Sequence, residues 1–338
     1  MRLCLLLIVS LLSVGSAAAQ RLTLVELNCE NLFDTKHDSL KQDQEYLPDA
    51  LRRWTDRRYW RKLNHTAQTI LSACDDGIPD MVALCEVEND TVMRDLTRRS
   101  LLRNAAYEYI MTNSPDVRGI DVALLYSPFS FQLLAAYPLR VVPCRNDMRP
   151  TRDMLYACGR TADGDTLHVF VVHAPSRYGG ELHSRPFRLC VAERLALSVD
   201  SIYTLHPRAR IVVAGDFNDF DNAPALKLIA SHRLSDIALQ ASAPDGIRGT
   251  YRYQGDWNLL DHIFVSPALY NKVDSVCIHA PRFLLEDEPL YGGYRPRRTY
   301  NGPRYQRGYS DHLPLVARFN LGDAQPLPSQ SPSHEEAQ

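Results

Sequence analysis

The chain has 338 residues, of which 45% are hydrophobic and 23% are charged, with 16 Gly and 21 Pro. This ordinary composition excludes a collagen-like chain, a coiled coil and a wholly disordered protein. The formal net charge is −2, which excludes the strongly basic balance of a protein that coats nucleic acid. Any polyanionic ligand must therefore be bound by a local basic patch.

The N-terminal segment has the pattern of a secretory signal peptide. Arg2 precedes an apolar run from Leu3 to Leu12, and small residues from Ser16 to Ala19 follow. A positive start, a short apolar run and an A-x-A ending are typical of a cleaved export signal, and the run is too short to span a bilayer. A buried first strand or helix is the alternative interpretation. We expect cleavage after Ala19 and a secreted or periplasmic protein without stable membrane insertion.

The chain has eight cysteines, and removal of residues 1–19 would leave an odd number. An odd number does not indicate a disulfide framework, and the chain has no C-x-x-C motif of a zinc ribbon or a thioredoxin-like site. Apolar surroundings predict small buried side chains for Cys74, Cys85 and Cys190. Cys144 and Cys158 flank a polar, proline-containing turn and are candidates for a disulfide in an oxidising compartment.

Hydrophobic periodicity predicts strands and helices that alternate irregularly. In chain order they are a strand at 22–28, a helix at 59–73, a strand at 80–84, a helix at 90–103, strands at 106–111, 120–127, 131–142, 153–161 and 166–172, a helix at 185–204, a strand at 210–215, a short helix near 223–230, and strands near 261–266 and 313–319. This order indicates an α+β domain with two sheets inside helical layers. We expect one catalytic domain over residues 20–320 and a disordered tail over residues 321–338.

At six places in the sequence, acidic, amide or imidazole side chains lie directly at the end or the start of a hydrophobic run. The residues are Asn28 with Glu30, Glu86, His173, Asp216 with Asn218, Asp261, and Asp311 with His312. Each place alone has an ordinary explanation as a helix cap, a turn or a solvated loop. Burial of a carboxylate or an imidazole is costly unless the group is paired or bound to a metal. Six such places therefore predict side chains that converge on one cleft.

The chemistry that needs such a set is metal-assisted hydrolysis of phosphoesters. Oxygen donors from Glu86, Glu30, Asp311 and Asn28 suit Mg²⁺ or Mn²⁺, and the cation would polarise a phosphoryl oxygen. Zinc-protease chemistry, nucleotide-driven phosphoryl transfer and α/β-hydrolase chemistry are disfavoured, because the chain has no H-E-x-x-H, P-loop or G-x-S-x-G motif.

Four motifs resemble those of the endonuclease/exonuclease/phosphatase superfamily of metal-dependent phosphoesterases. LNCENLF is similar to the first strand motif of the family, LCEVEN to its metal-glutamate motif, and GDFN and SDH to its two signature motifs, all in the order of the family. The resemblance runs from about residue 22 to 319. It implies a four-layer α/β/β/α sandwich, with two mixed sheets face to face and helices outside.

The resemblance also implies roles for the metal-side residues. Glu86 would be the principal metal ligand, with Asn28 and Glu30 near the metal and the phosphate. Glu30 stands where several nucleases of the family have Asp. Asp216 would activate the attacking water, and Asn218 would help to hold the phosphate during in-line displacement.

The remaining roles concern the imidazoles of the site. Asp311 would serve as a metal ligand or an imidazole partner, and His312 would contact the scissile phosphate. Asp261 matches a carboxylate that orients a catalytic imidazole. His173 matches a second histidine found in deoxyribonuclease-like members, although Val172 stands where many relatives have Asn.

Basic and aromatic segments indicate an anionic substrate. Residues 291–309 contain five Arg and five Tyr directly before SDH, and residues 52–62 form a second basic-aromatic stretch. Arg forks bind phosphate and Tyr stacks on bases, although such a segment is also compatible with a solvated surface lid. We also expect Arg118 and Arg177 to contact the substrate.

The segments do not identify one substrate. We expect the chain to be a monomeric exported nuclease that acts on nucleic acid. A phosphoesterase for lipid, inositol or sugar phosphates is the alternative, and a non-catalytic binding module on the same fold is a remote one.

Overall fold

The computed structural model describes residues 21–74 and 77–322. The expected signal peptide at residues 1–19 and most of the predicted tail lie outside the described residues. The first two residues of that predicted tail belong to the packed domain. Leu321 is buried, and the carbonyl oxygen of Gly322 accepts a hydrogen bond of 2.7 Å from Lys272 Nζ. Within the described ranges, no helix is long and apolar enough to cross a membrane.

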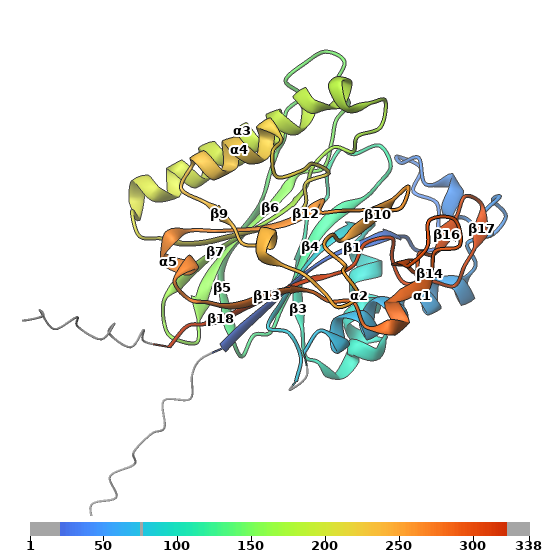
Figure 1. The fold of residues 1–338 in the computed structure, drawn as a ribbon, viewed down its shortest axis with the longest axis horizontal. Helices are drawn as coiled ribbons and strands as arrows, with labels where there is room; N and C mark the ends of the chain where they lie inside the picture. The colour runs from blue at the N-terminus through green and yellow to red at the C-terminus, as the bar shows by residue number, and fades with distance from the viewer. Residues whose placement is uncertain (1–20, 75–76, 323–338) are drawn as a thin grey trace, which may run out of the picture.

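Two six-stranded mixed sheets form the centre of the molecule (Figure 1). The first sheet has the order β13 (Val273–Ile278), β18 (Leu315–Asn320), β1 (Arg21–Leu32), β2 (Met81–Val87), β4 (Asp121–Tyr126) and β3 (Glu108–Met111). The second has the order β5 (Phe131–Leu139), β6 (Met154–Thr161), β7 (Thr166–His173), β8 (Arg210–Asp216), β12 (Asp261–Val265) and β9 (Ser235–Asp236). Each sheet contains one parallel pair, β1 with β2 and β7 with β8.

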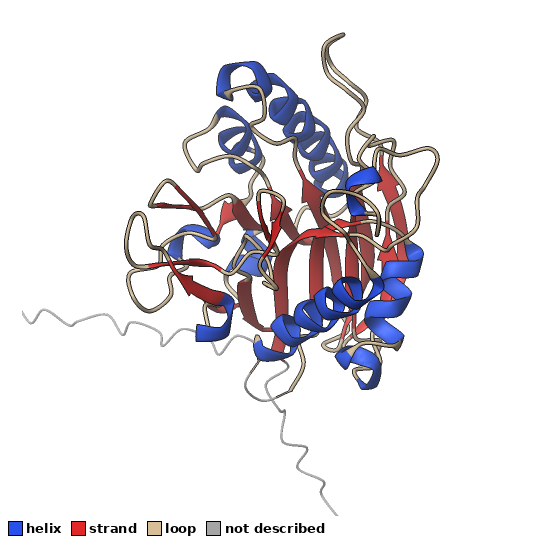
Figure 2. Cartoon of the chain, turned by 90° about the vertical axis from the view of Figure 1, so that its right-hand side faces the viewer, coloured by secondary structure: helices blue, strands red, loops and turns tan. Residues whose placement is uncertain are grey.

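Helices cover the outer face of each sheet, which completes the four layers (Figure 2). α1 (Asp56–Ser72) and α2 (Asp90–Arg98) pack on the first sheet, and α3 (Glu181–Leu205) and α4 (Pro224–Ser231) pack on the second. The described chain also contains α5 (Pro267–Tyr270) and short 3₁₀ turns at Gln44–Tyr46, Leu101–Asn104, Ala238–Gln240 and Arg282–Leu284. This arrangement confirms the α+β four-layer sandwich.

β1 shows how one strand contributes to two apolar layers. Leu22 and Leu24 belong to the core between the sheets, whereas Val25 and Leu27 pack beneath the helices. Successive side chains of a strand point to opposite faces, so a strand covered on both faces is a nearly continuous apolar run. Glu26 interrupts this run, and its side chain is fully buried.

The predicted elements are present, and several of their ends differ. The helix predicted over 90–103 ends at Arg98, because Ser100 begins a separate 3₁₀ turn and its Oγ accepts from the backbone N–H of Leu102. The helix predicted from residue 185 already begins at Glu181.

Other strands were not predicted. They are β9, β13 and the three small hairpins β10 (Tyr251–Tyr253) with β11 (Asp256–Asn258), β14 (Leu285–Asp287) with β15 (Tyr294–Pro296), and β16 (Tyr300–Asn301) with β17 (Arg304–Tyr305). The hairpin strands have two or three residues each, which is too short for an alternating pattern to be recognised.

Candidate active site

The polar residues at the strand ends meet at one end of the two sheets. β7, β8 and β12 are neighbours, and their registers place His173 beside Asp216 and Asp216 beside Asp261. On the facing sheet, Glu86 lies at the end of β2, and Asn28 of β1 pairs with the residue just before it. The sequence-predicted convergence of these five residues is therefore seen in the structure.

Gly215 explains how His173 and Asp216 come together. A Cβ atom at Gly215 would lie 1.8 Å from the carbonyl oxygen of Val172, and the glycine has φ +152°. Only glycine allows the backbones of β7 and β8 to approach so closely at this point. As a result, Nε2 of His173 lies 3.7 Å from Oδ2 of Asp216.

Several site residues have the left-handed backbone conformation that non-glycine residues rarely adopt. The φ angles are +50° at Glu30, +59° at Asn31, +61° at Glu86 and +51° at Asn218. The pairing of β1 and β2 shifts register at this point, as does the pairing of β2 and β4. Bulges and positive φ angles redirect side chains at strand ends and occur often at functional sites, and here they turn these side chains toward the site.

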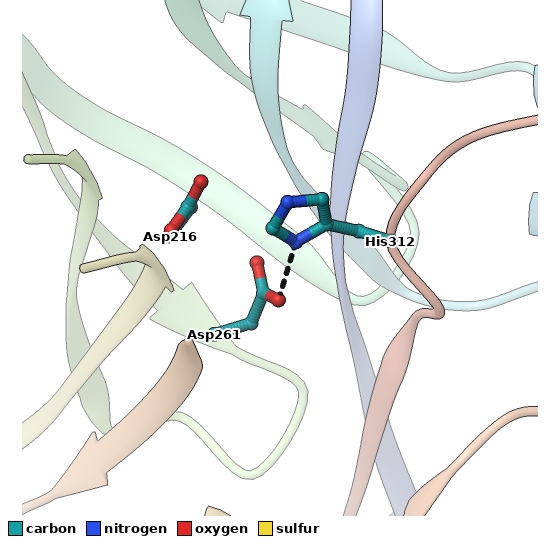
Figure 3. A group of neighbouring side chains, drawn as sticks. All are labelled: Asp216, Asp261 and His312. Carbon is teal, nitrogen blue, oxygen red and sulfur yellow. Dashed lines mark hydrogen bonds and ion pairs between the residues drawn. The ribbon is translucent and has the colours of Figure 1, made fainter. Parts of the chain in front are cut away.

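Asp261 and His312 form a buried carboxylate–imidazole pair (Figure 3). Nδ1 of His312 lies 2.7 Å from Oδ2 of Asp261, and the same oxygen accepts from the hydroxyl of Thr250. Burial lowers the pKa of His312, but the carboxylates of Asp261 and Asp216 outweigh it, so the pKa lies well above the ordinary value. The protonated imidazole is therefore favoured, and a charged imidazole can donate a hydrogen bond to an anionic oxygen.

The serine of the SDH motif connects this histidine to β1. The Ser310 hydroxyl donates to the carbonyl oxygen of Asn28 over 2.6 Å, and it accepts from the backbone N–H of His312 over 3.1 Å. The first and the last motif of the chain are thus joined by one side chain.

Asp216 lies at the centre of the site. Its Oδ2 accepts from Nδ2 of Asn28 over 3.0 Å, and its Oδ1 accepts from the backbone N–H of Asn218 over 2.8 Å. Burial and the neighbouring Asp261 raise the pKa of Asp216 to about 7. A carboxylate with such a pKa suits a general base that accepts a proton from water near neutral pH.

His173 has no charged role in this structure. Burial lowers its pKa well below the ordinary value, with Arg152 and Arg118 adding to the effect, so the imidazole is neutral. Nε2 faces Glu86 Oε1 at 3.9 Å as well as Asp216, and the buried Nδ1 has no hydrogen-bond partner among the described residues. A neutral imidazole here can accept a proton or a hydrogen bond from the substrate or the attacking water.

Glu86 has one carboxylate oxygen that accepts no hydrogen bond within the described residues. Its Oε2 accepts from the backbone N–H of Asn31 over 2.8 Å, whereas the neighbours of Oε1 in the described chain are Arg118 at 3.7 Å and His173 at 3.9 Å. With Asp216 and Asn28 nearby, the donors are oxygen atoms, which fit a hard divalent cation such as Mg²⁺ or Mn²⁺.

A second arrangement of ligand atoms lies beside Glu86. Asp216, Asp261 and His312 each offer one atom within 4.8 Å of the others. However, Nδ1 of His312 is engaged by Asp261 and the Asp261 Oδ2 atom already accepts two bonds. Glu86 Oε1 accepts no hydrogen bond within the described residues and is therefore the less engaged candidate ligand for a cation.

The structure uses two of the predicted metal ligands differently. The carboxylate of Glu30 accepts from the backbone N–H of Thr299 over 2.6 Å and lies 3.7 Å from Lys62 Nζ, and Oδ2 of Asp311 lies 3.0 Å from Arg298. The left-handed turn at Glu30 directs its side chain toward residues 299–300. Both carboxylates therefore anchor the segment before the SDH motif.

Of the two predicted substrate-binding arginines, one lies at the site. Arg118 donates to Oδ1 of Asn31 over 2.7 Å and lies 3.7 Å from Glu86. Arg177 instead pairs with Glu181, one helical turn further along, at 2.8 Å and stacks on Phe220. Only Arg118 keeps its predicted position against the site.

A cleft of about 770 Å³ adjoins the catalytic residues. Arg118 and Asn31 line the cleft, as do Tyr46, Arg149, Arg152 and Tyr178. Arg152 is buried, pairs with Asp116 at 3.1 Å and donates to the carbonyl oxygen of Ala174, which also accepts from Asn218. The cleft thus connects to the loop after His173.

Two buried ionisable residues of the site were missed. Glu26 of β1 is fully buried, and burial together with the charges of Asp261 and Asp216 raises its pKa well above the ordinary value, which favours the neutral acid. Lys62 of α1 donates to Thr299 Oγ1 over 2.7 Å. The available signals were a lone Glu in an apolar strand and a Lys on the apolar face of a predicted helix.

Comparison with known proteins identifies the family. The model of the Endonuclease/Exonuclease/phosphatase family matches residues 23–320. A search of curated protein sequences gives no match. The solved structures agree in fold with this chain at low sequence identity.

Three of these structures illustrate the range. A mannosyl-6-phosphatase from Bacteroides thetaiotaomicron is 18% identical, with a TM-score of 0.57, and the match covers 88% of this chain and 98% of that one. Truncated TDP2 from Caenorhabditis elegans is 16% identical, with a TM-score of 0.54 and coverage of 89% and 97%. The human Nocturnin catalytic domain is 19% identical, with a TM-score of 0.53 and coverage of 89% and 94%. The chain therefore belongs to the endonuclease/exonuclease/phosphatase family of phosphoester hydrolases.

Proposed function

We propose that this chain is an exported phosphodiesterase that requires Mg²⁺ or Mn²⁺ and hydrolyses nucleic acid. The supporting observation is a basic rim beside the catalytic end of the sheets. Arg297, Arg304 and Arg307 are exposed, and none has an acidic partner within the described residues. Their segment packs on α1, because His65 bonds to the carbonyl oxygen of Gly308. Free guanidinium groups suit a polyanionic backbone.

The rim continues onto α1. Arg61 and Arg297 both act on the pKa of His65, which places the two guanidinium groups near the same imidazole. Arg58 stacks on Tyr305 of the same segment. Arginines and tyrosines from two chain segments are therefore combined on one surface, as base stacking and phosphate contacts require.

The proposed mechanism is in-line attack of water on phosphorus. When bound, the cation at Glu86 supplies positive charge to a phosphoryl oxygen. Asp216 accepts the proton of the attacking water, and Asn218 and Asn28 hold this carboxylate in place. His312, charged and oriented by Asp261, donates to a phosphoryl oxygen as negative charge develops there.

The cleft beside Arg118 favours a second candidate, a phosphatase for a compact sugar or inositol phosphate. Its volume of about 770 Å³ is within the usual range for small-molecule sites. Two arginines of the 291–309 segment, Arg295 and Arg298, are engaged by Glu286 and Asp311. This candidate shares the catalytic residues and differs in what occupies the cleft.

One assay separates the two candidates. Purified residues 20–338 are incubated with Mg²⁺ or Mn²⁺ and supercoiled plasmid, and in parallel with a phosphate-release panel of sugar, inositol and lipid phosphates. EDTA and Glu86→Ala are the controls. Plasmid nicking that both controls abolish supports the nuclease. An intact plasmid with metal-dependent release from a panel member would replace it with the phosphatase.

Export and assembly are tested separately. The full-length chain is expressed in a bacterial host, and the N-terminus of the protein in the periplasm or medium is sequenced. We expect it to begin at Gln20, and retention of an intact N-terminus in the cytoplasm would contradict export. Light scattering of the purified protein checks the proposed monomer.

A further inference from the structure

Two cysteines lie on segments that pack together beside the cleft. Cys144 belongs to the segment between β5 and β6, and Cys190 lies in α3. Sγ of Cys144 is 3.8 Å from the carbonyl oxygen of Pro186, one helical turn before Cys190, and Sγ of Cys190 is 3.5 Å from the carbonyl oxygen of Val142. Each sulfur thus contacts the backbone adjoining the other cysteine.

The surroundings of the two thiols differ. Cys144 is exposed, whereas Cys190 is buried within the core beneath α3. Burial raises the pKa of Cys190 to about 12, and the adjacent Cys144 adds to the shift, which agrees with direct proximity of the two thiols. Cys144 is therefore the accessible thiol and Cys190 its neighbour on the helix.

Cys158 is not placed to pair with Cys144. It lies within β6, where its cross-strand partners are Ala135 of β5 and His168 of β7. Cys158 packs in the layer beneath α3, but it lines a cleft with Leu205 and His206 at the C-terminal end of the helix, whereas Cys144 contacts Pro186 near the start of the helix. The pairing considered from the sequence is therefore not the one that the contacts favour.

We propose that Cys144 and Cys190 are joined by a disulfide in the exported protein. Such a bond needs an oxidising compartment, so its occurrence in the cell rests on the proposed export. It would close the seam between α3 and the segment of residues 140–153.

The oxidant is a low-molecular-weight disulfide such as glutathione disulfide. The exposed thiolate of Cys144 attacks one sulfur of the oxidant, which breaks its S–S bond and releases one thiolate. Cys190 then loses its proton and attacks the Cys144 sulfur, and the second thiolate leaves. Two protein thiols are oxidised, one disulfide is reduced, and the two protons end on the released thiols.

The bond would act on the wall of the cleft. Met148, Arg149, Thr151 and Arg152 follow Cys144 and line the cleft, and Phe187 of α3 lines it from the other side. A covalent link across this seam would keep the two walls at a fixed separation. The segment would then be less open to local unfolding.

Peptide mapping provides the test. Reduced residues 20–338 are incubated with glutathione disulfide, alkylated and digested. We expect a peptide pair joined through Cys144 and Cys190 and a loss of two free thiols per chain. Cys158→Ser is the matched control and should give the same linked pair, whereas Cys144→Ser, an exposed change, should abolish it. Trypsin cleavage after Arg145 should be several-fold slower in the oxidised protein.

The proposal fails if folded, oxidised protein carries Cys144 as a free thiol, as a glutathione adduct only, or joined to another cysteine. Circular dichroism confirms that each variant is folded. Because linkage is measured on purified protein, its failure is independent of the export experiment. A protein that is linked in vitro but retained in the cytoplasm would contradict export and leave the pairing intact.

Discussion

The candidate active site has two halves that are built in different ways. In the strand-end half, the register of β2, β7, β8 and β12 places Glu86, His173, Asp216 and Asp261. In the loop half, residues 279–313 run through short hairpins and are held by side chains of α1 and β1. The first half is positioned by sheet hydrogen bonds, the second by buried charges.

Because of this difference, we expect substitutions in one half to change activity and substitutions in the other half to change stability. Removal of a strand-end side chain leaves the ladder hydrogen bonds intact, so we expect activity to be lost while the fold remains. Removal of a buried charge from the loop half leaves its partner uncompensated, and the cost of an unpaired buried charge appears in stability.

The largest effect is expected for Glu86→Ala. Loss of the carboxylate that faces the cation should reduce metal-dependent turnover by on the order of 10³-fold, with no fall in melting temperature. Steady-state kinetics and calorimetry of the same preparation measure both. Retained turnover would contradict a role of Glu86 in catalysis. A large drop in melting temperature would contradict the proposed difference between the two halves.

The next effect is expected in the loop half, for Lys62→Met. Glu30 would then be buried without its cation, which should destabilise the protein by about 3 kcal/mol. Urea unfolding of the variant gives the difference in free energy of unfolding. The double variant Lys62→Met with Glu30→Gln is the control and should recover much of the loss. Equal destabilisation in both would show that the charge pair is not the cause.

A smaller effect tests the substrate side of the strand-end half. Arg118→Ala should raise KM for an anionic substrate by about tenfold, the value of one charge-assisted hydrogen bond. Arg177→Ala is the matched control, because its guanidinium pairs with Glu181, and its KM should change little. If KM increased for Arg177→Ala and not for Arg118→Ala, the substrate would contact the loop after His173 and not Arg118.

The smallest effect concerns pH. Burial and the neighbouring Asp34 raise the pKa of Glu88 to about 8. A pKa raised in the folded state means that its stabilising contribution is complete below the unfolded pKa, about 4.3, and is lost as the pH rises through about 8. We expect a melting temperature several degrees lower at pH 8.5 than at pH 6.5 in EDTA. Glu88→Gln should reduce this slope without removing it, because burial also raises the pKa of Glu30 and of Asp216 to about 7. An unchanged slope would exclude a contribution from Glu88.

The same contrast explains what the sequence could predict. Long strands with polar ends, such as those before Glu86 and Asp216, were recognisable because burial of both faces leaves a continuous apolar run. The partners of Glu30 and Asp311, which are Lys62 and Arg298, were not predictable, because no periodic pattern relates either pair. The ion pair of Arg177 with Glu181 was likewise not predicted, and a substrate contact of Arg177 would compete with it.

The left-handed backbone at Glu86 has a consequence for engineering. Glu86 has φ +61°, which costs a glutamate conformational energy that a glycine at the same position would not lose. Glu86→Gly should therefore give a protein that is inactive and yet harder to unfold than the native chain. The native glutamate would thus lower thermal stability while it supports activity. The more stable Glu86→Gly variant would be suited to binding a substrate without cleaving it.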